Sequence, residues 1–294
     1  MKLAGLFSSP AGSTPSSSLL GKLFNEAGFE LALVGGPVRD AIMGRKSPDL
    51  DFTTDATPDQ TLRVIKKSVD AHWDIGKEFG TIGARIGDDT IEITTYRAEK
   101  YDPESRKPLV AFGNDLTEDL KRRDFTVNSM ALRLPSKVFV DPSNGLQDLL
   151  DLVLRTPGRP EDSFEDDPLR MLRAARFASQ LGFQIDPEAF RAMGEMRERL
   201  SIVSAERIQV EIKKLMLGTK PRLGLVALVD SGLAEIVLPE LPALKLEVDE
   251  HHHHKDVYEH SITVLEQAIA LEERLGGPNL VIRLAALLHD IGKP

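Results

Sequence analysis

The first 150 residues alternate short apolar runs with polar turns, a pattern typical of strands joined by loops and a few helices. The run 30–34 predicts a buried strand, and further strands are predicted at 72–77, 81–86, 90–96, 131–134 and 138–140. Helices are predicted at 19–27 and 57–69. Residues 98–118 have no clear period, which indicates a lid or a binding loop.

Beyond about residue 154, nearly every segment has the apolar spacing of an amphipathic helix. Ser163 and Asp166 are spaced as a capping box, which predicts a helix over 164–181. Further helices are predicted at 187–200, 205–217 and 221–231. At the other end of the chain, residues 5–18 are rich in Gly, Ser, Pro, Thr and Ala, which predicts a flexible tail.

The composition narrows the class of protein. A chain of 294 residues can form two or three domains with their own cores. It has no apolar run of about 18 residues, so we expect no membrane span, and its lack of cysteine fits the reducing cytoplasm, where we expect the protein. The net charge of −9 argues against a general nucleic-acid coat but allows a local basic groove. A single Trp argues against a broad stacking surface for single strands.

A candidate phosphate and metal site follows the first predicted strand. Gly35 and Gly36 turn the chain into a short helix, and backbone N–H groups at such a turn bind anions. Asp49 and Asp51 stand at i and i+2, so on a strand both carboxylates point to one face. Either feature alone is common in proteins without catalysis. Together, with Arg39 close by, they provide what metal-assisted phosphoryl or nucleotidyl transfer requires.

Two other charged segments allow more than one interpretation. The basic triplet before Asp124 is either the solvated end of a helix or a site that places Arg123 on a triphosphate and Asp124 on a ribose hydroxyl. Glu92, in the strand predicted at 90–96, is equally an exposed residue or a third carboxylate beside the aspartate pair.

A charged stripe marks the helix predicted at 164–181. Asp167, Arg170 and Arg173 are spaced three residues apart on one face, and Arg176 follows one step further. On an arbitrary helix, such a stripe is most often a salt-bridged surface.

The motifs in this chain resemble those of one known family. GG-x-VRD, GR and D-x-DF within 35–52, RRDFT-x-N at 122–128, and EDDPLR at 165–170 continuing into RMLRAARFA are similar to its signatures. The family is that of the class II nucleotidyltransferases, namely the CCA-adding tRNA nucleotidyltransferases and bacterial poly(A) polymerases. Two positions depart from the usual pattern, since Ser129 stands for Ala and Asp166 for Glu.

The resemblance implies an α+β fold, in which a nucleotidyltransferase head with a mixed β-sheet and helices precedes an all-helical neck and body. The implied division is a flexible tail at 1–18, a catalytic head at 19–153, a neck for base recognition at 154–220, and a body with an incomplete HD domain at 221–294.

The resemblance also implies the reaction, which is transfer of nucleotides from CTP and ATP to the 3′ end of tRNA with release of pyrophosphate. Asp49 and Asp51 would hold two Mg²⁺ ions, one lowering the pKa of the 3′-hydroxyl and one stabilising pyrophosphate. The residues implied in nucleotide binding are Gly35, Gly36, Arg39, Arg123, Asp124, Asn128, Asp167, Arg170, Arg173 and Arg176.

His260 and the pair His289–Asp290 resemble the start of an HD phosphohydrolase domain, which binds a divalent metal through one His, a His-Asp pair and a later Asp. The sequence stops four residues after Asp290, so we expect the domain to be incomplete. Three alternatives remain open. A poly(A) polymerase shares the head motifs, a phosphohydrolase would need the later Asp, and a non-catalytic RNA-binding protein would need a degenerate aspartate pair. The sequence leaves the oligomeric state undetermined.

Overall fold

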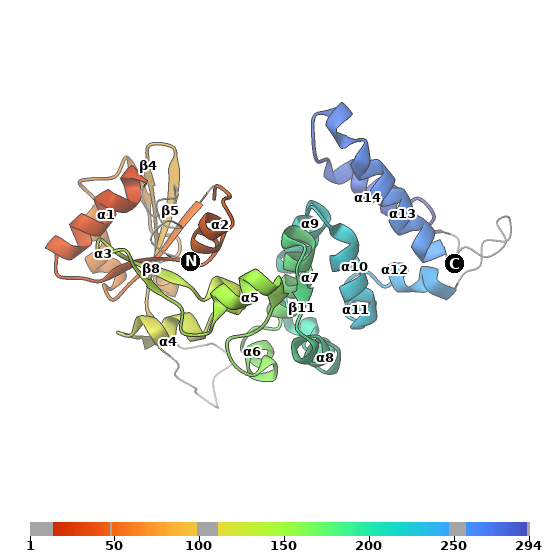
Figure 1. Cartoon of the computed structure of the whole chain (residues 1–294), viewed down its shortest axis with the longest axis horizontal. Helices are drawn as coiled ribbons and strands as arrows, with labels where there is room; N and C mark the ends of the chain where they lie inside the picture. Colours follow the sequence, from red (N-terminus) through yellow and green to blue (C-terminus); the bar gives the residue numbers. More distant parts are fainter. Residues whose placement is uncertain (1–13, 48, 99–110, 247–256, 293–294) are drawn as a thin grey trace. The chain divides into compact units, whose positions relative to one another are not determined.

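Our computed structural model describes residues 14–47, 49–98, 111–246 and 257–292. The chain divides into two compact units, residues 1–151 and residues 152–294 (Figure 1). The first unit combines a sheet with helices, and the second is almost entirely helical. This confirms the predicted α+β class. Among the described residues, no helix is long and apolar enough to cross a lipid bilayer.

A seven-stranded sheet forms the centre of the first unit. Its strands are β1 (Leu31–Val34), β2 (Asp49–Thr54), β3 (Ala71–Trp73), β4 (Thr81–Ile86), β5 (Asp89–Thr95), β8 (Ala131–Leu134) and β9 (Val138–Val140). Their order across the sheet is β3-β4-β5-β2-β1-β8-β9. Within it β2 and β5 are parallel and the other neighbouring pairs are antiparallel, so the sheet is mixed, as predicted.

Helices α1 and α3 cover one face of this sheet (Figure 1). The helical elements of the first unit are α1 (Pro15–Glu26), α2 (Gly36–Ile42), α3 (Pro58–Ile65), η3 (Lys77–Phe79), α4 (Leu116–Lys121), η4 (Thr126–Asn128) and α5 (Gly145–Asp151), and a small second sheet pairs β6 (Arg97–Ala98) with β7 (Ala111–Phe112). Phe52, Ile82 and Ile93 of the covered face are at most 1% exposed. Because side chains alternate along a strand, Asp49 and Asp51 point to the opposite face.

The first helix begins earlier than its sequence pattern indicated. Residues 15–18, predicted as part of the flexible tail, form the first turn of α1, so this part of the prediction is wrong. Thr14 caps the helix by accepting a hydrogen bond from Ser17 N at 3.1 Å, and Pro15 occupies the first helical position. Ser16 also donates a hydrogen bond to Asp89 at 2.6 Å, which ties this turn to β5.

Other boundaries differ by a few residues. α3 ends at Ile65 rather than near residue 69, and β3 ends at Trp73. Of the predicted loop at 98–118, residues 99–110 lie outside the described residues, and the remainder contains β7 and the start of α4. Asp115 caps α4 by accepting a hydrogen bond from Thr117 N at 2.7 Å.

The second unit consists mainly of short helices. Its elements are β10 (Val153–Leu154), α6 (Pro160–Asp166), α7 (Leu169–Leu181), β11 (Gln184–Ile185), α8 (Pro187–Glu195), η5 (Arg197–Ile202), α9 (Ala205–Met216), α10 (Pro221–Asp230), α11 (Ala234–Val237), α12 (Glu240–Ala243), η6 (Leu244–Leu246), α13 (Val257–Ala270), η7 (Glu272–Leu275) and α14 (Leu280–Leu288). The helices predicted near 205–217 and 221–231 are confirmed as α9 and α10.

The single helix predicted over 164–181 is wrong, because two helices occupy this region. α6 ends at Asp166 and α7 begins at Leu169. Asp167, between them, is extended with φ −145° and ψ 99°, since the ring of Pro168 disfavours a helical conformation in the residue before it. Ser163 therefore lies inside α6 rather than at the start of a helix.

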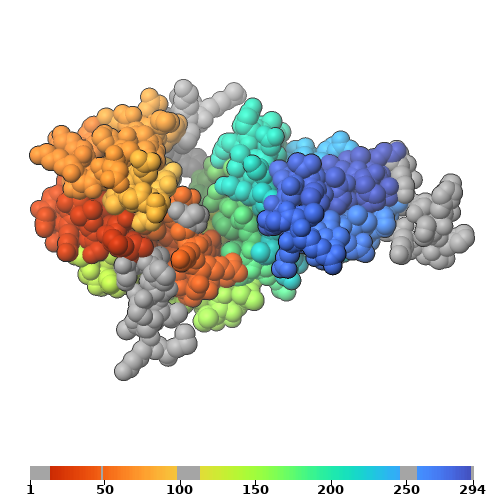
Figure 2. Space-filling view, turned by 90° about the horizontal axis from the view of Figure 1, so that it is seen from above, coloured from red at the N-terminus to blue at the C-terminus, as the bar shows by residue number. Residues whose placement is uncertain are grey.

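A buried ion pair fastens α14 within the second unit. Arg283 donates to both carboxylate oxygens of Glu272, at 2.7 and 2.6 Å. It also donates to the carbonyls of Met216 and Gly218, at 2.6 and 2.7 Å, and so caps the C-terminal end of α9. α13 and α14 pack against each other and form the blue surface in Figure 2.

Candidate active site

Three carboxylates share one face of the sheet in the first unit. Asp49 and Asp51 lie on β2, and the register of the parallel β2–β5 pair aligns Asp51 with Glu92. Residues paired across neighbouring strands point to the same face, so Glu92 joins the two aspartates predicted from the sequence. The alternation of side chains along β5 indicated the face on which Glu92 lies. Its alignment with Asp51 could not be predicted without knowing that β5 pairs with β2.

The surroundings of Asp51 favour a bound cation. Burial raises the pKa of the Asp51 carboxyl, and the charges of Glu92 and Asp49 raise it further, while the guanidinium of Arg123 lowers it. A cation among these oxygens would relieve the repulsion between like charges. Carboxylate oxygens are also ligands that Mg²⁺ prefers. The residues present therefore fit a divalent metal.

Two guanidinium groups lie against the glycine turn between β1 and α2. Gly35 has φ +72°, in the left-handed region that favours glycine. A Cβ at Gly35 would lie 3.0 Å from Arg123 Nη1, and a Cβ at Gly36 would lie 3.7 Å from Arg39 Nη2. The lack of a side chain at Gly35 thus gives Arg123 room beside the turn, and Arg39 lies at ordinary contact distance from Gly36. The resulting positive charge suits the phosphates of a nucleotide.

Asp124 belongs to a buried network of hydrogen bonds. Arg39 donates from Nη1 to Asn128 Oδ1 at 2.6 Å, and Asn128 donates from Nδ2 to Asp124 Oδ1 at 2.9 Å. All three residues are at most 7% exposed. The interpretation of this segment as a solvated helix end is therefore wrong for Asp124. The network joins η4 to α2 and fixes Arg39 beside the glycine turn.

Asp119, which the sequence did not single out, orients Arg123. Its carboxylate lies 3.4 Å from Arg123 Nη2, and it accepts hydrogen bonds from Thr53 Oγ1 at 3.2 Å and Arg97 N at 3.1 Å. Thr53 shares its face of β2 with Asp51, so Asp119 links Arg123 to the strand of the aspartates. Asp119 is 7% exposed. This burial distinguishes it from the solvated acids of the segment, and the sequence did not reveal it.

The charged stripe expected on one helix is divided, because its three arginines lie on α7 and Asp167 lies before this helix. Asp167 lies in the break between α6 and α7 and accepts hydrogen bonds from Arg207 Nη2 at 3.2 and 3.4 Å. Arg170, on α7, donates to Ser163 Oγ at 2.8 Å. The prediction that one continuous helix carries Asp167 and Arg170 is therefore wrong. Arg207, which the sequence did not single out, lies on α9.

Arg176 is buried between α7 and α9, where it is 7% exposed. Its Nε lies 2.6 Å from Glu211 Oε2, and its guanidinium carbon lies 3.8 Å from the centre of the Phe177 ring. Arg173 lies 5.6 Å from the centre of the same ring and is only half-buried. Arg176 thus joins two helices. Because it is buried, only Arg170 and Arg173 of the three arginines are partly exposed to solvent.

His260, His289 and Asp290 form a cluster in the second unit. Their ligating atoms lie within 4.8 Å of one another. Asp290 Oδ2 is 3.3 Å from His289 Nε2 and 3.9 Å from His260 Nε2. The structure therefore brings together the three residues that resemble the start of an HD domain. Metal binding by this cluster stays a prediction.

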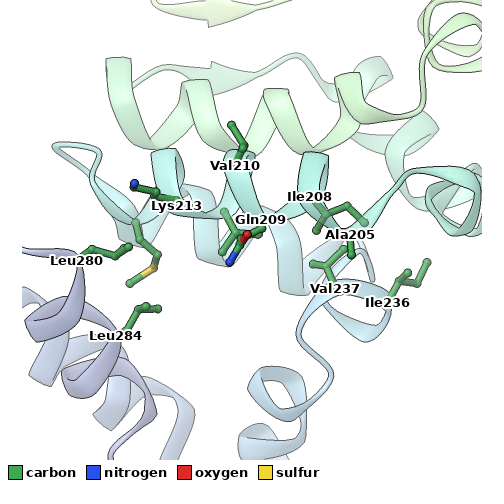
Figure 3. A pocket seen from close by; sticks show the side chains of 11 residues that line it. Ala205, Ile208, Gln209, Val210, Lys213, Ile236, Val237, Leu280 and Leu284 are labelled. Carbon is green, nitrogen blue, oxygen red and sulfur yellow. The ribbon is translucent and has the colours of Figure 1, made fainter.

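An apolar cavity of about 710 Å³ lies between α9, α11 and α14 in the second unit (Figure 3). Aliphatic side chains such as Ile208, Val237 and Leu284 line it, together with Lys213. This lining contains no Asp, Glu, His or Cys side chain.

Comparison with protein families matches three segments of the chain. Residues 31–155 match the poly A polymerase head domain, and residues 182–244 match the probable RNA and SrmB-binding site of polymerase A. Residues 257–294 match the HD domain.

Curated relatives include two CCA-adding enzymes. That of Bacillus subtilis is 45% identical over 222 residues, which are 75% of this chain and 54% of that protein. That of Staphylococcus aureus is 44% identical over 192 residues, which are 65% of this chain and 47% of that protein. The chain therefore spans about half the length of the curated relatives it matches.

Solved structures agree with these matches. The Bacillus stearothermophilus CCA-adding enzyme in complex with CTP is similar with a TM-score of 0.70 and 28% identity, over 94% of this chain and 66% of that one. A tRNA nucleotidyltransferase complexed with a primer tRNA and an incoming ATP analogue is similar with a TM-score of 0.71 and 26% identity, over 92% of this chain and 75% of that one. The chain thus has, in this order, segments that match a poly A polymerase head domain, an RNA-binding segment of polymerase A and an HD domain, and it is similar to CCA-adding enzymes.

Proposed function

We propose that this chain adds C, C and A to the 3′ end of tRNA, using CTP and ATP and releasing pyrophosphate. The observation that carries the proposal is the alignment of Asp51 with Glu92 across β2 and β5, with Asp49 on the same face. The adjacent glycine turn with Arg39 and Arg123 offers the positive charge that a triphosphate needs. The identity of 45% with a CCA-adding enzyme favours this activity over poly(A) synthesis.

Enzymes of this family generally use divalent metals, and in our proposal Asp49, Asp51 and Glu92 hold two Mg²⁺ ions. When bound, the metals supply activation of the RNA 3′-hydroxyl and neutralise charge on the leaving pyrophosphate. Arg39 and Arg123 bind the phosphates of the nucleotide beside the glycine turn.

Other residues of the head keep these groups in position. Asp119 holds Arg123 through its 3.4 Å ion pair, and Asn128 holds Arg39 through its 2.6 Å hydrogen bond. We assign Asp124 to the ribose hydroxyl of the nucleotide.

We assign base recognition to Asp167 and Arg170 in the second unit, with Arg173 available to phosphates. The carboxylate accepts a hydrogen bond from the amine that cytosine and adenine share, and the guanidinium donates to a ring nitrogen of either base. Uracil and guanine present the opposite polarity at these positions, which leaves buried groups unpaired.

Extension of a tRNA that lacks its 3′ CCA end tests the proposal. The purified chain is incubated with this RNA, Mg²⁺ and each labelled nucleotide in turn. We expect CTP to be added first and ATP to follow. Repeated addition from ATP alone would instead indicate a poly(A) polymerase. Hydrolysis of phosphoesters without extension would indicate a phosphohydrolase, and RNA binding without extension would indicate a non-catalytic protein.

A further inference from the structure

The chain contains a single tryptophan, Trp73, which lies on the same face of the sheet as the proposed catalytic carboxylates. The strand register aligns Trp73 with Gly83, Gly83 with Glu92, and Glu92 with Asp51. Neighbouring strands lie about 4.8 Å apart, so the row from Asp51 to Trp73 spans about 14 Å across β2, β5, β4 and β3.

The indole ring lies over Gly83 and leans toward the carboxylates. A Cβ at Gly83 would overlap the indole Nε1 and Cε2, so the ring occupies the space that a side chain would fill. Trp73 is nevertheless 36% exposed, which leaves part of the ring open to solvent. The glycine thus allows a flat aromatic surface directly beside Glu92.

An exposed cation accompanies this ring. Arg85 lies two residues from Gly83 on β4, so its side chain points to the same face. It is exposed, and it aligns with Thr90 on β5, which in turn aligns with Asp49 on β2. An aromatic ring beside a cation is the combination that proteins use to stack a base and neutralise the neighbouring phosphate of a single strand.

Different kinds of residue flank the carboxylates on the two sides of β2 and β5. Gly35 and Arg39 belong to the β1–α2 side, whereas Trp73 and Arg85 lie on β3 and β4, beyond β5. In phosphoryl transfer the attacking and leaving oxygens are roughly in line on opposite sides of the phosphorus. With the triphosphate on the β1–α2 side, the 3′-oxygen of the RNA must approach from the β5 side.

We propose that Trp73 stacks on a base at the 3′ end of the RNA substrate and that Arg85 contacts an adjacent phosphate. This inference rests on the proposed function and adds the RNA side of the same site. A nucleotide whose 3′-hydroxyl reaches Asp51 and Glu92 extends over Gly83, where the indole lies.

Intrinsic fluorescence tests the proposal, because Trp73 is the only fluorophore of its kind in the chain. The full chain is titrated with an acceptor-stem hairpin RNA that lacks the CCA end, and binding is followed separately by anisotropy of a label at the 5′ end. We expect the RNA to change the tryptophan emission in step with the anisotropy. CTP with Mg²⁺ alone should leave the emission unchanged, since the nucleotide binds on the other side.

Substitutions supply a second readout. Trp73→Ala should raise the KM for RNA about tenfold, as expected for the loss of one base–aromatic stack, and leave the KM for CTP unchanged. Trp73→Phe should recover most of the affinity, and Arg85→Ala should lower the salt dependence of RNA binding. Ile75→Ala is the matched control, because Ile75 is an apolar residue that is 88% exposed and lies outside β3.

The outcomes separate this inference from the proposed function. RNA extension with unchanged tryptophan emission would overturn the stacking role while the proposed activity stands. A Trp73→Ala chain with lowered thermal stability but unchanged RNA affinity would also overturn it, since the ring would then only shield Gly83. Failure of the RNA to bind at all would overturn both.

Discussion

Asp167 accepts two hydrogen bonds from the guanidinium of Arg207, although the two residues lie on different elements of the second unit. The N···O distances are 3.2 and 3.4 Å. Asp167 can make this contact because it lies in the extended break before Pro168 and not within a helix. Its carboxylate is therefore oriented from outside α7, while Arg170 is held from α6 by Ser163.

Base selection should depend on this arrangement. Asp167→Ala and Arg170→Ala should lose discrimination against UTP and GTP, because the wrong bases would no longer leave buried groups unpaired. Arg207→Ala should weaken discrimination in the same direction, since it frees the Asp167 carboxylate. Steady-state incorporation of all four nucleotides measures this. If the Asp167 and Arg170 variants lower the incorporation rates of CTP, ATP and UTP by the same factor, these residues form only a salt-bridged surface.

Asp49→Ala and Asp51→Ala should each lower the extension rate by several orders of magnitude, because each removes a proposed metal ligand. Circular dichroism should show an intact fold. Asp88→Ala is the matched control, since this acid is exposed in the turn between β4 and β5. Near-normal turnover with Mg²⁺ in either variant would contradict the assignment of the metal ligands.

Glu92→Gln should lower the extension rate by about a hundredfold, the effect typical of losing one electrostatic contact to the reacting groups. Glu78→Gln should have no effect, since Glu78 is an exposed acid of η3. Rates at saturating CTP and RNA measure the difference. If Glu92→Gln behaves like Glu78→Gln, Glu92 is only an exposed strand residue.

Glu272→Gln should lower the free energy of unfolding by about 3 kcal/mol near pH 7, because Arg283 would remain buried without its charged partner. The hydrogen bond from Arg283 holds the pKa of Glu272 below its usual range. The stabilisation is therefore fully present above the unfolded pKa and is lost as the pH falls through the folded pKa.

Chemical denaturation of both proteins between pH 7 and the acid range measures this pH dependence. The stability difference between the natural chain and Glu272→Gln should narrow as the pH falls. A difference that stays constant or grows on acidification would show that the pair is not ionised as described.

Gly145→Ala should destabilise the first unit by about 1–3 kcal/mol, the usual cost of forcing extra atoms into a packed site. A Cβ at Gly145 would overlap the carbonyl oxygen of Thr126, and backbone atoms cannot swing aside. Thermal unfolding measures the loss. Gly158→Ala is the control, because a Cβ at that glycine meets nothing within 4 Å. Equal melting temperatures for the two variants would contradict the close approach of α5 to η4.

The amino-acid sequence alone was enough to predict many of the local elements and most of the candidate site residues. The apolar pattern predicted individual strands of the first unit and the helices α9 and α10, because burial imposes periods that are read along the chain. The mixed sheet was implied by the family resemblance. The spacing of Asp49 and Asp51 placed both on one face, because side chains alternate along any strand. Ordered motifs such as RRDFT-x-N indicated the family.

Contacts between residues far apart in the chain could be identified only in the folded structure. Glu92 aligns with Asp51 through a parallel strand pair, and Asp167 accepts hydrogen bonds from Arg207, which lies 40 residues further along the chain. The position of Trp73 over Gly83 depends on the register of an antiparallel pair. The pattern of apolar and polar residues predicts which side chains share a face of a strand. It predicts neither the neighbouring strand nor the register of the pair, and the neighbour and the register determine which residues of the two strands make contact.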